Sequence, residues 1–218
     1  MIQGLGFVGA AMAVATALAR DIDGQPIYNV VGLELDNEEG RRRASALADG
    51  CFPFVTTDNK LVDSTSKCHT AGNLTAKISR DVISNADIVV VDINLDVSKA
   101  SDGLVHVEFE PFRSAIRDIG NRARPGKLII VETTVPPGTC ANIAAPELTR
   151  CCAERGLPDD SILLAHSYER VMPGSNYLES IREFWRVYSG HTDLAAQACR
   201  SFLENIIDVE RYPLTRLA

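Results

Sequence analysis

The sequence lacks any apolar run near the ~20 residues that a membrane-spanning helix needs. Its first residues also lack the basic and apolar pattern of a secretory signal. These two absences predict a cytoplasmic protein with no membrane partner. Basic charge is scarce too: 22 Lys and Arg stand against 29 Asp and Glu, a net charge of -7. That balance gives no electrostatic support for binding nucleic acid.

Metal-binding patterns are missing as well. None of the six cysteines forms a C-x-x-C pair, and no two histidines have zinc-finger spacing, so we expect no metal site. Without a secretory signal, the cysteines are expected to be reduced thiols that pack helices. The chain shows no internal repeat and no low-complexity segment.

What is present is the composition of an ordinary globular protein, with 45% hydrophobic and 23% charged residues among 218. A chain of this length can form one large domain. No stabilising disulfide or metal is needed for a core of that size.

A glycine-rich turn stands almost at the start of the chain. Gly4–Gly9 reads G-x-G-x-x-G and is followed by an alanine-rich helical run over 10–20. Glycines at this spacing let a strand turn sharply into a helix, whose N-terminus can hold a pyrophosphate. A glycine-rich turn can also be a plain connection, and the lead before it, residues 1–3, is short for a first strand.

A second apolar strand is expected over 28–35, and Glu34 lies near its end. An acidic residue at this place binds the adenosine ribose of NAD and repels the 2′-phosphate of NADP, so NAD is favoured. Arginines 41–43 follow. These arginines either form a solvated face of a helix, or one of them, Arg41, covers the adenine or its ribose.

The remaining pattern alternates strands and helices. Strands are expected over 74–78, 88–91, 127–131, 161–166 and 186–190, and helices over 37–49, 110–121, 140–154 (with a break at Pro146) and 193–207. The stretch 58–73 is polar with no firm period, 92–103 is expected to be a loop at the C-terminal edge of the 88–91 strand, and 175–184 is polar and irregular. This order predicts an α/β protein with a Rossmann-type, doubly wound, mostly parallel sheet and helices on both faces. We expect one NAD-binding domain over 1–208, then a final strand and the start of a linker over 209–218.

Two strand-end segments carry polar residues where ligands bind in such sheets. Thr133 and Thr134 precede a Pro-Pro-Gly turn, where their hydroxyls either face a ligand or cap the helix that starts near Thr139. The second segment, 168–174, reads Tyr-Glu-Arg-Val-Met-Pro-Gly.

These motifs together resemble the nucleotide-sugar 6-dehydrogenases, which act on UDP-glucose, GDP-mannose or UDP-N-acetylmannosamine. The resemblance rests on the glycine turn, on Thr-Thr-Val-Pro-Pro-Gly-Thr at 133–139, and on the 168–174 segment followed by Arg-Val-Tyr-Ser-Gly at 186–190. It covers nearly the whole chain, but only the family's N-terminal, cofactor-binding domain.

The resemblance implies oxidation of a sugar C6 hydroxyl to a carboxylate, with two NAD molecules as hydride acceptors. It implies that Thr134 holds a water at the reacting carbon and that Glu169 works beside it as a base or oxyanion partner. Glu169 and Arg170 would contact the UDP-sugar. The implied cofactor-binding residues are Gly4, Gly6, Phe7, Val8, Gly9, Glu34, Arg41 and Thr133.

Several features depart from the family pattern. Residues 93–96 read Ile-Asn-Leu-Asp where the family usually has Val-Pro-Thr-Pro, and Tyr168 stands where proline is usual. Within the family, the Glu-Arg-Val-x-Pro-Gly form of the motif favours a UDP-N-acetyl-hexosamine as the substrate, with UDP-glucose as the second choice. The family's nucleophilic cysteine, in Gly-x-Cys-Leu-Pro, and its catalytic Lys and Asn do not occur before Ala218. We therefore expect this chain to be inactive alone, and a full-length parent to be a homodimer.

Two other functions fit the same residues. A β-hydroxyacid dehydrogenase would share the glycine turn, although it lacks paired threonines before Pro-Pro-Gly. A nucleotide-binding module without catalysis would explain the short first strand and the altered 93–96 loop. His166 lies three residues before Glu169, where it is either an acid–base group or a structural histidine.

Overall fold

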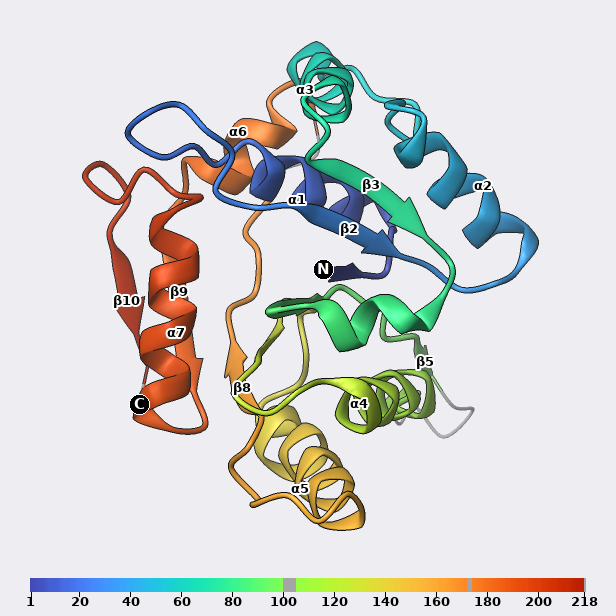
Figure 1. Ribbon diagram of the computed structural model, residues 1–218, viewed down its shortest axis with the longest axis vertical. Coiled ribbons are helices and arrows are strands. Elements are labelled where there is room, and N and C mark those ends of the chain that lie inside the picture. The colour runs from blue at the N-terminus through green and yellow to red at the C-terminus, as the bar shows by residue number, and fades with distance from the viewer. Residues whose placement is uncertain (100–104, 172–173, 218) are drawn as a thin grey trace.

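The computed structural model describes residues 1–99, 105–171 and 174–217 (Figure 1). Its main sheet has eight strands in the order β10-β9-β8-β7-β4-β1-β2-β3. These strands are β1 (Ile2–Gln3), β2 (Val30–Leu33), β3 (Leu74–Lys77), β4 (Ile88–Val91), β7 (Leu128–Val131), β8 (Leu163–His166), β9 (Arg186–Gly190) and β10 (Leu214–Arg216).

The strand directions confirm the predicted doubly wound sheet. From β3 through β2, β1, β4 and β7 to β8 every pairing is parallel. The chain runs outward from β1 to β3, then returns to β4 and runs outward the other way. The strand order therefore reverses between β1 and β4, and ligands bind at such a reversal. Beyond this unit, β9 lies antiparallel to β8, and β10 lies parallel to β9.

Helices cover both faces of the sheet (Figure 1). One face packs against α1 (Phe7–Ala17), α2 (Glu38–Ala48), α3 (Asn59–Thr70), α6 (Tyr177–Arg182) and α7 (Asp193–Glu204). The other face packs against the 3-10 turn η1 (Arg80–Asn85), α4 (Glu110–Arg122), the π-helical turn η2 (Cys140–Ala144) and α5 (Ala145–Glu154).

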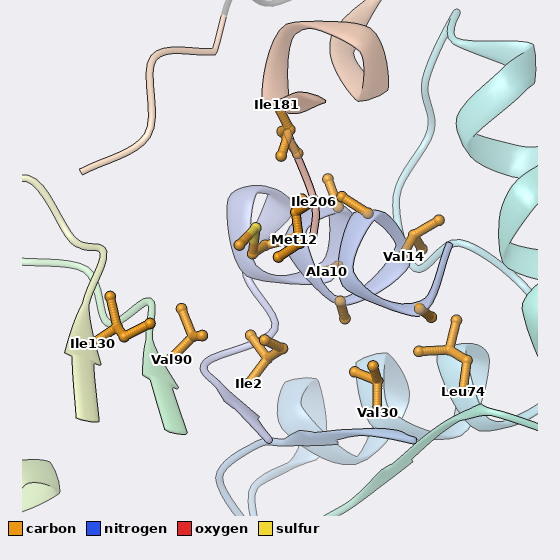
Figure 2. Close-up of a cluster of buried hydrophobic side chains, with 14 of the residues drawn as sticks. Ile2, Ala10, Met12, Val14, Val30, Leu74, Val90, Ile130, Ile181 and Ile206 are labelled. Atoms are coloured by element: carbon orange, nitrogen blue, oxygen red, sulfur yellow. The ribbon is translucent and has the colours of Figure 1, made fainter. Parts of the chain in front are cut away.

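Alternation along the strands divides the core into these two layers. Ile2, Val90 and Ile130 point toward α1, as Figure 2 shows. Their neighbours Val89 and Val91 point the other way, toward α4 and α5. Because successive strand residues face opposite sides, a continuous apolar run is what a sheet covered on both faces requires.

Two helices come from stretches whose sequence predicted no element, α3 and α6. In α3 the buried residues are Leu61, Thr65 and Cys68, which have helical spacing. Of these three, only Leu61 has a large apolar side chain. The preceding Asp58 is itself fully buried: one carboxylate oxygen accepts the Leu61 N–H at 3.0 Å, and the other accepts the Leu178 N–H at 2.8 Å. A polar side chain therefore joins these two helices, which an apolar pattern cannot reveal.

Two smaller expectations have clear outcomes. The loop expected over 92–103 contains one strand of a hairpin, β5 (Val97–Lys99), which pairs with β6 (Val105–Val107); residues 100–103 lie outside the described residues. The break expected at Pro146 is confirmed, because a π-helical turn precedes α5 and the proline occupies its first turn.

Candidate nucleotide-binding site

The glycine turn between β1 and α1 is built so that two of its positions exclude any side chain. Gly4 has φ +92°, and a Cβ there would overlap the carbonyl oxygen of Asp92. A Cβ at Gly9 would overlap the carbonyl oxygen of Gly4. Gly6 differs, because no protein atom lies within 4 Å of its Cβ position. The turn thus closes tightly on the sheet and stays open on its outer side, where a pyrophosphate can approach.

The start of α1 offers free backbone donors to an anion. Gly6 is the N-cap residue, and no side chain in the described part of the chain caps this helix. The N–H groups of Phe7 and Val8 lie in the first turn, where partial positive charge favours a phosphate. The Phe7 ring packs against Tyr177 and the 52–54 loop, with ring centroids 4.7 Å apart for Phe7 and Tyr177.

Glu34 holds its carboxylate against this turn. Its Oε2 accepts the Leu5 N–H at 3.0 Å, and its Oε1 accepts the Leu35 N–H at 2.9 Å. Arg43 lies 3.5 Å from Oε2. Each oxygen keeps lone pairs for ribose hydroxyls, so the carboxylate is oriented before any ligand binds. Arg41 is exposed and pairs with Asp36, so of the three arginines the structure places Arg43 beside Glu34.

A cavity of about 430 Å³ opens between the turn and α4. Gly4, Gly6 and Glu34 line it on one side. Arg43 and Asn94 also line it. The cavity therefore continues from the pyrophosphate cradle past the acidic residue of β2, as an adenosine site requires.

The two threonines after β7 differ in their surroundings. The Thr133 hydroxyl accepts the Ile93 N–H at 2.9 Å and lies within 3.1 Å of the Val91 carbonyl oxygen. It therefore fastens the end of β7 to the end of β4. Thr134 is exposed, and the part of the chain that the structure describes gives its hydroxyl no hydrogen-bond partner.

Glu169 follows β8, the strand next to β7. Its Oε2 accepts the Val171 N–H at 2.8 Å, and its charge acts on Asp92 and on the Tyr177 hydroxyl. Arg170 is exposed. Thr134 and Glu169 thus leave the same edge of the sheet from adjacent strands. The last part of the 168–174 motif, residues 172–173, lies outside the described residues.

Sequence reasoning missed a buried charged cluster at this edge, formed by Asp92, Glu132 and Arg186. The Arg186 Nη1 donates to Glu132 Oε1 at 2.7 Å, and both residues are 1% exposed. Desolvation, and then the nearby Glu132 carboxylate, raise the pKa of Asp92 well above its ordinary value. Asp92 and Glu132 each directly follow an apolar strand, and this position could have indicated that both carboxylates lie at the ligand edge of the sheet. The position of Arg186, at the start of a strand, did not indicate that it is buried beside them.

The thiols of Cys140 and Cys199 and the ring of His166 lie in surroundings that suppress their charged forms. Burial raises the pKa of Cys140 to about 11 and that of Cys199 to about 12. Burial lowers the pKa of His166, whose Nδ1 lies 2.7 Å from the Val131 carbonyl oxygen. A nucleophilic cysteine needs a lowered pKa, so these two thiols do not have the setting of one.

These features define a dinucleotide-binding domain of the Rossmann class. They are a parallel sheet with a glycine turn where the strand order reverses, a helix N-terminus without a side-chain cap, and an acidic residue at the end of the second strand. The chain belongs to the UDP-glucose/GDP-mannose dehydrogenase family, whose NAD binding domain matches residues 1–206. NAD is its cofactor, and the residues fit it: Gly4 and Gly9 let the turn close tightly on the sheet, Gly6 leaves the approach to the pyrophosphate open, and Glu34 is placed for the ribose.

Curated relatives are dehydrogenases of nucleotide sugars. The UDP-N-acetyl-D-mannosamine dehydrogenase of Methanocaldococcus jannaschii is 28% identical over 211 residues, which are 97% of this chain and 43% of that protein. The enzyme of the same name from Pyrococcus horikoshii is 25% identical over 209 residues, 94% of this chain and 45% of that protein. The chain thus spans less than half the length of these relatives.

Solved structures agree on the fold. The NDP-N-acetyl-D-galactosaminuronic acid dehydrogenase of Methanosarcina mazei superposes with a TM-score of 0.86 at 25% identity, over 100% of this chain and 43% of that one. The UDP-D-ManNAc dehydrogenase structure from Pyrococcus horikoshii has a TM-score of 0.79 at 19% identity, over 99% and 46%. Among the residues described, no helix is both long and apolar enough to cross a membrane.

Proposed function

We propose that this chain is the cofactor-binding half of a nucleotide-sugar 6-dehydrogenase, which oxidises the C6 hydroxyl of a UDP-sugar to the carboxylate. The observation that carries the proposal is the position of Thr134 and Glu169 at the ends of β7 and β8. These strands are hydrogen-bonded neighbours, and β7 also pairs with β4, which borders the glycine turn through β1. When bound, NAD supplies the hydride acceptor at this edge.

The two side chains have complementary tasks in this proposal. The exposed Thr134 hydroxyl holds a water at the reacting carbon. Glu169 takes a proton from that water, or, in its protonated form, donates a hydrogen bond to the oxyanion formed there. Its bond with the Val171 N–H engages one oxygen, Oε2, and no hydrogen bond of the other oxygen occurs among the residues that the structure describes, so Oε1 can do this work. A carboxylate positioned beside a bound water can act as a general base.

A UDP-N-acetyl-hexosamine is the preferred substrate in this proposal, with UDP-glucose second. The Glu-Arg-Val segment at 169–171 favours it, and so does the similarity to UDP-N-acetyl-D-mannosamine dehydrogenases. Arg170 is exposed beside Glu169 and can reach a substrate phosphate. For a full-length protein we expect a cytoplasmic homodimer.

The sequence contains no Gly-x-Cys-Leu-Pro element, and burial suppresses the thiolates of Cys140 and Cys199. We therefore propose that the chain alone binds NAD without turning over a sugar. The missing groups can be supplied by fusing residues 1–206 to the remainder of the Methanocaldococcus jannaschii relative, in place of its matching part. NADH formation from UDP-N-acetylmannosamine, UDP-N-acetylglucosamine and UDP-glucose is then measured.

The fusion tests the roles of the two residues directly. Glu169→Gln should lower kcat by about 10²–10⁴, the usual contribution of a general base, with NAD affinity unchanged. Thr134→Ala should act in the same direction. Glu183→Gln, at the exposed C-cap residue of α6, is the control with the same chemical change and should leave turnover unaltered. Unchanged turnover in Glu169→Gln would contradict the proposal and favour a binding module without catalysis.

A further inference from the structure

The carboxyl groups of Asp92 and Glu132 are neighbours by the register of the sheet. Val91 pairs with Val131, so the two acidic residues are the next pair along adjacent parallel strands. Strands in a sheet are about 4.8 Å apart, and paired residues point to the same face. Here that face is the one that holds Val90 and Ile130 beneath α1. The two carboxyl groups lie within hydrogen-bonding reach of each other.

The pair lies directly under the glycine turn. A Cβ added at Gly9 would lie 3.0 Å from the Asp92 Cβ, and one at Gly4 would overlap the Asp92 carbonyl oxygen. The Asp92 N–H also donates to the Gln3 carbonyl at 2.8 Å. Any shift of Asp92 would therefore move the backbone that holds the pyrophosphate.

The charges of the cluster do not balance unless a proton is added. Asp92 and Glu132 would bring two negative charges and Arg186 brings one positive charge. The Arg186 guanidinium donates to Glu132 Oε1, while Glu132 Oε2 and Asp92 Oδ2 are buried without a donor among the described residues. Asp92 as a whole is partly exposed, but this oxygen is shut off from solvent. An unpaired buried charge is costly, and so is a buried oxygen without a donor. One proton between the carboxyl groups removes both costs.

We propose that Asp92 and Glu132 share one proton at neutral pH, and that this neutral cluster with Arg186 positions the glycine turn for the pyrophosphate. Asp92 and Glu132 are positioning residues in this account, since they act through the turn. Loss of the shared proton leaves a net negative charge under the pyrophosphate, which repels it and weakens NAD binding.

Arg186 is the cation whose charge acts on Asp92 and favours its ionised form. Glu169, from the loop after β8, adds negative charge. Burial raises the pKa of Tyr177 on α6 and the pKa of Cys199 on α7, which keeps both uncharged. Burial lowers the pKa of His166 at the end of β8, which keeps it neutral near pH 7. Glu169 therefore favours retention of the proton, Arg186 opposes it, and the uncharged neighbours leave that balance unchanged.

Infrared spectroscopy of the 218-residue chain at neutral pH, without NAD, tests the shared proton. A protonated carboxylic acid has a carbonyl stretch that a carboxylate lacks. The wild type should show it, and Asp92→Asn and Glu132→Gln should each lack it. In each amide variant one carboxylate remains opposite the Arg186 guanidinium. The cluster is then neutral, so both variants should fold. Asp81→Asn, at an exposed carboxylate, should keep the signal. Absence of the signal in the wild type, or its persistence in both amide variants, overturns the proposal.

Calorimetric titration with NAD between about pH 6 and pH 9 tests the positioning role. Wild-type affinity should fall about tenfold as the pair ionises, a size typical of one partly screened charge near a diphosphate. Asp92→Asn should remove this fall, and Asp81→Asn should keep it. An equal decline in Asp92→Asn overturns the positioning role. Absence of NAD binding at every pH in every variant would contradict the assignment of the NAD site instead, while the infrared result still decides the shared proton.

Discussion

At the scale of single residues, the site depends on where side chains are absent and where charges are buried. Gly4 and Gly9 matter because neighbouring backbone oxygens occupy their Cβ positions. Glu34 matters because two backbone N–H groups fix its carboxylate. The glycines and Glu34 could be predicted from spacing. The link between Asp92 and Glu132 could not, because it depends on which strands pair and in which register.

Substitution of Gly4 should destabilise the protein far more than substitution of a glycine with the same backbone conformation in open space. Gly4→Ala combines a positive φ with overlap on Asp92, so a loss of more than about 3 kcal/mol is expected in the free energy of unfolding. Gly72→Ala has φ +75° and an empty Cβ position, so only the conformational cost of about 1 kcal/mol remains. Urea denaturation measures both. Equal losses would show that the overlap at Gly4 relaxes.

The raised pKa of Asp92 predicts how stability changes with pH. A carboxyl group whose pKa is raised by folding stabilises the protein fully below its ordinary pKa, and that contribution is lost as pH rises toward the raised value. The slope is up to about 1.4 kcal/mol per pH unit. Asp92→Asn carries no such proton. Its free energy of unfolding, minus that of the wild type, should therefore increase between about pH 5 and pH 8. A difference that stays constant with pH would rule out the shift.

At the scale of helices and strands, apolar runs predicted the sheet well because both of its faces are covered. Strands β4 and β7 were recognisable as unbroken aliphatic runs. Helix α3 was not, because a buried carboxylate fixes its N-terminal end and Leu61 is its one large buried apolar side chain; helix α6 was not, because it is only six residues long. The hairpin of β5 and β6 could not be predicted either. All three residues of β5 are exposed, so the strand does not alternate between buried and exposed positions.

Removal of the Asp58 carboxylate should therefore cost more than removal of an ordinary helix cap. Asp58→Ala leaves the N–H groups of Leu61 and Leu178 without their acceptor in a buried place, so we expect a loss of about 2–4 kcal/mol. Thr192→Ala, which removes a single cap bond to Ala195 at the start of α7, should cost about 1 kcal/mol. Denaturant titrations of the two variants compare them. A smaller loss at Asp58 than at Thr192 would show that the joint between α3 and α6 contributes little.

At the scale of the whole molecule, the fold brings four strand ends to one edge. The glycine turn, Glu34, Thr134 and Glu169 follow or end β1, β2, β7 and β8, spread over most of the chain, and the parallel order of these strands brings them to the same edge of the sheet. The family match over residues 1–206 agrees with this arrangement. The central claim is that NAD binds on the glycine turn.

NAD should stabilise the whole domain, because it binds only the folded turn. At a concentration 100 times its Kd, the gain in free energy of unfolding is about 2.7 kcal/mol. NADP should give a smaller gain, since the Glu34 carboxylate repels its 2′-phosphate. Thermal unfolding with each dinucleotide measures the difference. An equal or larger gain with NADP would mean that Arg43, and not Glu34, dominates the ribose site.

The most direct test is calorimetric titration of NAD into the wild type and Gly6→Ala. The Cβ position of Gly6 is free of protein atoms, so the variant should keep the wild-type stability while its new methyl group occupies the approach of the pyrophosphate. We predict one NAD bound per wild-type chain and at least about tenfold weaker binding to Gly6→Ala, a loss of about 1.4 kcal/mol. Undiminished binding to a well-folded Gly6→Ala variant, or no binding to the wild type, would contradict the account.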